Sequence, residues 1–158
     1  MVEVRGIGYM LAAKTVAMID IERAETVSAL WRYAGYGVVD GERERPTKGE
    51  KLHYNKRLKT TCYLIAVSML RSNSPYRKIY DSAREYYAAN RDWTKGHCHN
   101  ASLRKMTKIW LQHLWITWRK LEGMPTNDPY AHEKLAHNSY YTPQEFGWPA
   151  VDGAGILK

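Results

Sequence analysis

The chain has only two cysteines among its 158 residues, Cys62 and Cys98. Cys62 falls inside an apolar helical pattern and Cys98 lies between two histidines, so they are not the disulfide framework of a small secreted domain. No apolar run approaches the roughly 20 residues that a membrane-spanning helix needs. The N-terminus, Met1-Val-Glu-Val-Arg-Gly, lacks the apolar core of a signal peptide. We therefore expect a cytoplasmic protein that does not enter a membrane.

Recognisable catalytic and metal-binding motifs are also missing. The acidic residues are scattered and most lie beside Arg or Lys, which does not indicate a pair of catalytic carboxylates. Neither a Ser-His-Asp pattern nor a Walker phosphate loop is present. His97, Cys98 and His99 are of the types that bind zinc, but the ligand spacings of a finger or ribbon are absent. The residues alone therefore assign no catalytic residue and no metal site.

What the chain does have is an excess of positive charge. It carries 24 Lys and Arg against 16 Asp and Glu, a net charge of +8 and a pI of about 9.5. Such an excess favours a nucleic acid or another anionic surface as partner, with solubility alone as the alternative. The length and the 44% hydrophobic content suit one compact domain with a real core.

The charge is densest between Glu42 and Lys59, where seven Lys or Arg stand against three Glu. Asp40-Gly41 follows two valines and predicts a tight turn, so we expect this segment to form a short hairpin or ordered loop. Cations on a protruding backbone bind polyanions by displacing counterions from phosphates, although a solvated loop without a partner is the alternative. The predicted nucleic-acid contacts here are Arg43, Arg45, Lys48, Gly49, Lys51, Asn55, Lys56, Arg57 and Lys59.

A second predicted contact lies near the N-terminus. Val4-Arg-Gly-Ile-Gly8 places two glycines before an Ala-rich helical pattern over residues 9–19, as in the hairpin and second helix of a helix-hairpin-helix unit. Glycines let backbone N–H groups approach a phosphate at a helix N-terminus, where the helix dipole favours an anion. A Gly-rich turn into a core helix is the alternative. The residues predicted to bind nucleic acid in this segment are Arg5, Gly6, Gly8 and Lys14.

Helical spacing predicts an all-α fold, a compact helical domain with a basic hairpin or loop insertion. A helix is expected over about 26–34, with Tyr33 inward and Gly35 in a left-handed cap. Residues 55–71 are apolar on both sides, which is the pattern of a buried central helix. Ser74 is expected to cap a helix that runs to about residue 90, whose tyrosine stripe is more typical of a core than of a base-stacking surface.

The last expected helix begins at a cap on Asn100 and is ended by Gly123 and Pro125. Its polar face is either a second phosphate-contacting surface or a solvated one, and comprises Arg104, Lys105, Lys108, Gln112, Arg119 and Lys120. We assign residues 1–123 to the helical domain and 124–158 to an extended Pro/Tyr-rich tail. The tail is expected to be disordered after Val151 and partly packed through Tyr130, Tyr140, Phe146 and Trp148.

Many short matches in order resemble the C-terminal half of a family of insertion-sequence transposases. These enzymes join an N-terminal RuvC-like domain, which bears four acidic residues, to a C-terminal helix-hairpin-helix transposase domain, and some are guided by a bridge RNA. The matches span roughly residues 2–137. They are Val4-Arg-Gly-Ile-Gly8, Leu30-Trp-Arg-Tyr-Ala-Gly-Tyr-Gly37, Lys48-Gly-Glu-Lys51, Tyr54-Asn-Lys-Arg-Leu-Lys59, Ser74-Pro-Tyr-Arg-Lys-Ile-Tyr80, Arg104-Lys-Met-Thr-Lys-Ile-Trp110, His113-Leu-Trp115 and Pro129-Tyr130.

The resemblance implies DNA recombination by acidic residues with a divalent metal in one domain and a serine nucleophile in the other. The chain lacks the RuvC-like half, and its loop from Tyr36 to Tyr54 holds no serine; Thr47 is the only substitute hydroxyl there, and Ser28 precedes the loop. We therefore expect a truncated or stand-alone domain that binds DNA, or guide RNA with DNA. It is expected to self-associate, to hold no cofactor of its own and not to cleave DNA alone.

A hypothesis from another class is a protein-interaction module, in which tryptophans contact a partner and the charge only keeps the chain soluble. The tryptophans concerned are Trp93, Trp110, Trp115 and Trp118. The two hypotheses differ in salt dependence, because phosphate binding weakens steeply with salt and an aromatic interface does not.

Overall fold

The computed structural model of the chain describes residues 1, 3–39, 41–43, 48–49, 52–126 and 141–151. The expected all-α class is confirmed. The helices are α1 (Tyr9–Met18), α2 (Val27–Tyr33), α3 (Lys56–Arg71), α4 (Arg77–Asn90) and α5 (Lys95–Leu121), joined by the short strands β1 (Val38–Val39) and β2 (Glu42–Arg43) and a 3₁₀ turn, η1 (Gln144–Phe146). None of the helices in these ranges is both long and apolar enough to cross a membrane.

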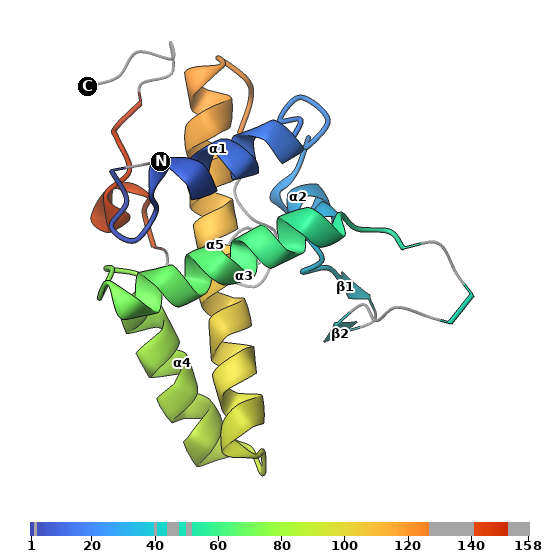
Figure 1. Ribbon diagram of the computed structural model, residues 1–158, viewed down its shortest axis with the longest axis vertical. Helices are drawn as coiled ribbons and strands as arrows, with labels where there is room; N and C mark the ends of the chain where they lie inside the picture. Colours follow the sequence, from blue (N-terminus) through green and yellow to red (C-terminus); the bar gives the residue numbers. More distant parts are fainter. Residues whose placement is uncertain (2, 40, 44–47, 50–51, 127–140, 152–158) are drawn as a thin grey trace.

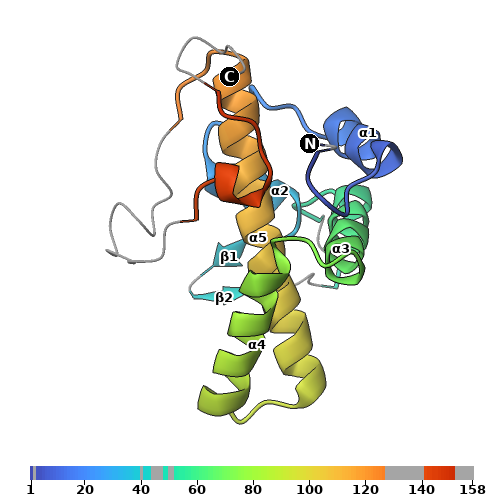
Figure 2. The ribbon, with the colours of Figure 1, turned by 90° about the vertical axis from the view of Figure 1, so that its left-hand side faces the viewer.

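Helix α5 is the axis of the molecule (Figure 1). Helix α4 runs antiparallel along its first half, α3 crosses its middle, and α1 lies along α3, so that α1 and α3 occupy the same side of α5 (Figure 2). Figure 1 also shows that α1 and α3 run in opposite directions. The beginning of α1 therefore lies beside the end of α3.

The core forms where one stripe of α3 meets α5. Leu58, Cys62, Ile65 and Met69 recur every third or fourth residue and are each at most 1% exposed. Burial of each such side chain contributes roughly 1.5–3 kcal/mol. The opposite side of α3 differs from the expectation of burial all round, because Leu64 remains 48% exposed.

Two helix starts also differ from the sequence prediction. Ser74 does not cap α4 with its side chain; its Oγ is buried without a hydrogen-bond partner among the described residues, and the helix begins at Arg77 after a turn in which the Arg77 amide donates to the Ser74 carbonyl. Helix α5 begins five residues before Asn100, because the Thr94 hydroxyl accepts from the His97 amide and forms the N-cap.

Helix α5 is buried on every side from Trp110 to Thr117. Gln112 and Arg119, which were expected on a polar face, are only 6% exposed. The Arg119 guanidinium is used internally: Nη1 donates to the carbonyls of Ile21 and Ala24, and Nε donates to that of Pro125. The chain segments on either side of the helix thus wrap around it and are held by a buried cation.

The described end of the expected tail packs into the same core. Phe146 is fully buried and Trp148 is 5% exposed, so the predicted packing of these two residues is confirmed. The Trp148 indole donates to the Tyr76 hydroxyl, which in turn bonds to Nδ1 of His113 at 2.6 Å. The predictions for Tyr130, Tyr140 and the residues after Val151 lie outside the described residues.

Candidate nucleic-acid interface

The predicted tight turn is confirmed as a two-residue connection between β1 and β2. Val38 pairs with Arg43 in an antiparallel register, and Gly41 has a φ of +78°, a conformation that glycine adopts without strain. Arg43 is exposed on β2. The predicted contacts Lys48 and Gly49 are also exposed, whereas Arg45 and Lys51 lie outside the described residues.

Asn55 forms the N-cap of α3 and holds the end of the basic segment against α2. Its Oδ1 accepts from the amides of Arg57 and Leu58, its Nδ2 donates to the Tyr33 hydroxyl, and its own amide donates to the Tyr33 carbonyl. Tyr33, expected to point inward, is 43% exposed, and its hydroxyl donates to the Met18 carbonyl. The structure therefore gives Asn55 a capping role at the point from which the cations of α3 project.

The first turn of α3 carries cations where helices usually carry acids. Lys56 and Arg57 are exposed, and Lys59 is half-buried with its Nζ 4.5 Å above the ring centre of Tyr54. The positive end of the helix dipole repels each such cation by roughly 0.3–1 kcal/mol. In the described part of the chain, the ion pairs are Arg77–Asp81 and Lys78–Glu145, so none of the α3 cations is neutralised there. Dipole and side chains together make this end of α3 strongly electropositive.

The glycines near the N-terminus have different roles from each other. Gly6 has a φ of +96°, and a Cβ there would lie 2.6 Å from the Ser72 Oγ and 2.9 Å from the Met69 Cα, so glycine is required for close packing against the end of α3. Gly8 is the N-cap of α1 and has open space around it. Arg5 and Lys14 are exposed.

The two sets of predicted contacts are consequently far apart. Residues 5–8 lie by the last turn of α3 and the basic segment leads into its first turn, a separation of about 24 Å for 16 residues at about 1.5 Å per residue (Figure 1). Lys14 lies on α1, between the two ends. The fold therefore places the two predicted sets of nucleic-acid contacts at opposite ends of α3.

Two cations of α5, Arg104 and Lys108, contact the chain before β1 and α2. They lie on the polar face that was expected to be either phosphate-contacting or solvated, and were not among the predicted nucleic-acid contacts. Arg104 Nη2 donates to the carbonyls of Tyr36 and Gly37, at 2.7 and 2.8 Å, and so holds the chain just before β1. Lys108 places its Nζ 3.9 Å from the ring centre of Trp31. Burial, with the charge of Arg104 adding to it, lowers the pKa of Lys108 to about 8. Arg104 and Lys108 are four residues apart and so lie on one face of the helix, which is the sequence signal that could have placed them together at this site.

The hydroxyls weighed as substitute nucleophiles belong to Ser28 and Thr47. Ser28 is exposed on α2. Thr47 lies outside the described residues. The structure therefore brings no nucleophile and base together at this site in the described ranges.

The histidines around Cys98 serve the packing of the α4–α5 tip. His97 stacks on the Trp93 ring with a centroid distance of 4.0 Å, Cys98 is buried, and the Nδ1 of His99 bonds to the Tyr80 hydroxyl at 2.6 Å. Among the residues that the structure describes, no three His, Cys, Asp or Glu side chains come together as a set of metal ligands.

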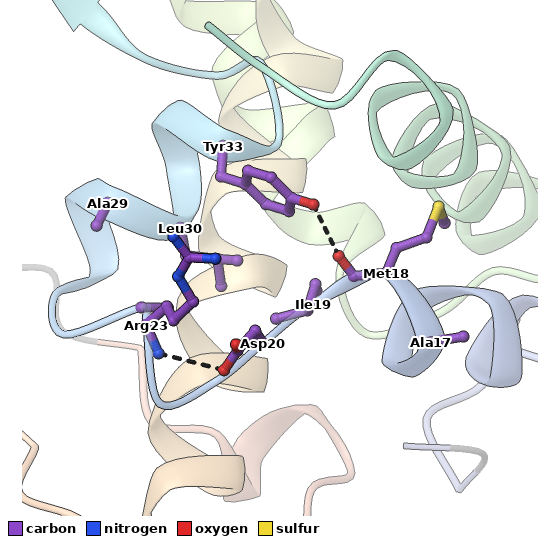
Figure 3. A pocket seen from close by; sticks show the side chains of 9 residues that line it. Ala17, Met18, Ile19, Asp20, Arg23, Ala29, Leu30 and Tyr33 are labelled. Atoms are coloured by element: carbon purple, nitrogen blue, oxygen red, sulfur yellow. Dashed lines mark hydrogen bonds between the residues drawn. The ribbon is translucent and has the colours of Figure 1, made fainter.

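A pocket of about 450 Å³ opens between the end of α1 and α2 (Figure 3). Tyr33 closes one side by its bond to the Met18 carbonyl, and the Arg23 amide donates to the Asp20 carboxylate at the other. Its charged lining residues, Asp20 and Arg23, have opposite signs. This pocket therefore lacks the net positive charge that a phosphate group needs.

Of the four tryptophans in the protein-interaction hypothesis, two lie in the core and two are at least partly exposed. Trp110 and Trp115 are fully buried and cannot contact a partner in the folded chain. Trp93 is 37% exposed, and Trp118 is partly buried with its indole donating to Glu122. Half of the proposed protein-binding surface is therefore core.

Comparison with protein-family models, curated proteins and solved structures gives no significant match to this chain.

Proposed function

We propose that this chain is a DNA-binding domain of the transposase type, which contacts phosphates through the β1–β2 hairpin, the basic segment after it and the first turn of α3. The observation that carries the proposal is the set of cations at the positive end of α3 that no acid among the described residues neutralises. An arrangement that costs folding free energy is explained if a polyanion compensates the repulsion when it binds.

The cap on α3 defines how a phosphate is held there. Asn55 already occupies the amides of Arg57 and Leu58, so a phosphate is contacted by the side chains of Lys56 and Arg57 rather than by those amides. Contacts of this kind fix position on a strand and carry no base readout. We therefore expect binding that depends strongly on salt and weakly on sequence.

The transposase assignment is supported by how two of the resembling motifs lie. Gly35, in the match over residues 30–37, has a φ of +80°. A Cβ there would lie 2.8 Å from Lys59 and 3.0 Å from Tyr54, which belong to the match over residues 54–59. The amide of Asn55 also donates to the Tyr33 carbonyl, which joins the same two motifs. Motifs that are separate in the sequence thus make one unit at the base of the basic segment. Within the family resemblance, guide RNA and self-association are part of the proposal, and strand cleavage by this chain alone is not.

The test is the binding of a labelled DNA duplex across a salt series. The variant K48A/K56A/R57A removes three exposed cations of the interface, and R84A/R91A/K95A removes three exposed cations from the α4–α5 tip, which lies far from the start of α3 in Figure 1. Both variants change the net charge equally. We expect the logarithm of the native affinity to fall linearly with the logarithm of salt, and the slope to decrease by about two to three units only in the interface variant.

Equal slopes for the two variants would contradict the proposed interface. Absence of native binding at low salt would contradict nucleic-acid binding as a whole. A structured RNA in a parallel series shows whether RNA is bound more tightly than DNA.

A further inference from the structure

A second pocket, also of about 450 Å³, lies between α2, the chain before β1 and α5. Its lining includes Ser28, Trp31 and Arg32 from α2, Tyr36 just before the hairpin, and Lys108 from α5. The Trp31 indole donates to the carbonyl of Lys108 at 2.9 Å while the ammonium of the same lysine lies over its ring. Helices α2 and α5 are thereby fastened together, and the wall that carries the lysine is rigid.

Two of the residues that line this pocket have charged side chains, and both are cations. Arg32 and Lys108 line it, and none of its lining residues is acidic. Arg104 follows on the next turn of α5, with its guanidinium 5.4 Å from the ring centre of Tyr36. Arg43 on β2 is near enough to Arg104 to lower the pKa of that guanidinium further, after the larger effect of burial. Arg104 repels the partly buried ammonium of Lys108, and a bound anion beside them would stabilise both cations.

We propose that this pocket binds a single nucleotide, with its phosphate on Lys108 and its sugar and base in the remaining space beside Trp31. A bare phosphate would leave most of the volume empty, whereas a pocket of this size holds a small organic ligand. The inference rests on the proposed function in one respect, since the nucleotide is taken to belong to a bound strand. A free nucleotide has the same chemistry, and the experiment separates the two sources.

The binding has a definite pH dependence. Arg104, on the same helix, repels the Lys108 ammonium. Arg32 on α2 and Tyr36 before β1 line the same pocket, and Arg43 on β2 lies near Arg104. Between pH 7 and 9.5 the Lys108 ammonium, whose pKa is about 8, loses its charge. A ligand that needs the ammonium should therefore bind about 30-fold more weakly at pH 9.5 than at pH 7.

The test measures AMP binding by equilibrium dialysis at pH 7 and pH 9.5. K108M keeps the apolar stem and removes the charge, and K105M makes the same change at an exposed position on α5. We expect K108M to lose tenfold or more in AMP affinity at pH 7 and K105M to stay within twofold. K108M keeps the bond from the Trp31 indole to the backbone carbonyl of residue 108, so its melting temperature should stay close to that of the native chain and unfolding would not explain the loss.

Three further measurements show whether the nucleotide is free or part of a strand, and separate failure of this proposal from failure of the proposed function. A single-stranded oligonucleotide that displaces AMP at lower concentration than AMP itself supports a strand nucleotide, and inorganic phosphate that competes as well as AMP overturns the nucleotide assignment. K48A/K56A/R57A should bind AMP as the native chain does. AMP binding without duplex binding means that the proposed function fails and the pocket takes a free nucleotide, whereas duplex binding without AMP or single-strand binding overturns the pocket.

Discussion

The two ends of α3 contrast in nearly every physical property. At its last turn, Gly6 packs against Met69 and Ser72, and the nearby Tyr76 and Phe146 are fully buried. At its first turn, Lys56 and Arg57 point into solvent with no acid among the described residues to neutralise them. One end is closed by packing, and the other presents exposed cations beside the Asn55 cap. The difference teaches that Gly6 at one end and Gly35 at the other both serve close packing, so that clustered positive charge, rather than glycine, marks the candidate surface at the first turn.

The largest expected effect is at the closed end, from G6S. A left-handed backbone costs a side-chain-bearing residue about 1–2 kcal/mol, and the clash of the new Cβ with the α3 backbone adds about 1–3 kcal/mol. We expect the free energy of unfolding, measured in urea, to fall by about 4 kcal/mol. The matched control is G8S, in which serine gains an N-cap in open space and stability stays equal or rises. Equal effects of the two changes would break the contrast.

The next effect is a pH dependence from His113. Its Nε2 donates to the Tyr141 carbonyl and its Nδ1 accepts from the Tyr76 hydroxyl, which is consistent with a neutral ring. Burial lowers the pKa of His113 from 6.5 to about 4, so the unfolded chain binds the proton first. Stability from this group is complete above about pH 6.5 and decreases by about 3 kcal/mol as the pH falls to 4. Urea unfolding of H113Q should lack this decrease; an unchanged pH profile would contradict the assignment.

A smaller effect is expected where the open end is fastened. N55A removes both the cap on α3 and the bond to Tyr33, and should lower the free energy of unfolding by about 1–2 kcal/mol. N55D keeps the cap with a negative charge at the helix N-terminus and should lose much less. A loss as large for N55D as for N55A would show that the bond to Tyr33, and not the cap, holds this end.

The smallest effect on stability has the most direct bearing on function. K56E replaces a cation by an anion at the positive end of α3 and should raise the free energy of unfolding by about 0.5 kcal/mol while it weakens duplex binding. K95E is the control, because it makes the same change in the first turn of α5, away from the interface. It should give the gain in stability without the loss of binding. Loss of both properties in K56E would mean that the cation supports the fold.

Local chemistry was sufficient to predict several elements. Thr26 caps α2 through the Ala29 amide, Gly35 ends that helix at a φ of +80°, and the turn at Gly41 forms the hairpin. Each depends on residues within a few positions of one another, which is the range over which capping and turn preferences act.

The rest depends on neighbours that are distant in the sequence. Helix α5 continues through Gly96, a weak helix former, because its first half packs along α4, while Thr94 caps its start. Arg119 is buried because carbonyls of two wrapping segments accept its bonds. For the site, charge density found the basic segment, but only the fold separates it from Arg5 and brings Lys108 beside the hairpin.

The central claim is that nucleic acid binds at the open end of α3, and lysine acetylation with and without a DNA duplex tests it most directly. Exposed lysines mark each region: Lys48 and Lys56 at the open end, Lys78 at the closed end and Lys95 at the α4–α5 tip. At low salt the duplex should slow acetylation of Lys48 and Lys56 severalfold and leave Lys78 and Lys95 unchanged. Protection of Lys78 or Lys95 without protection of Lys56 would contradict the account.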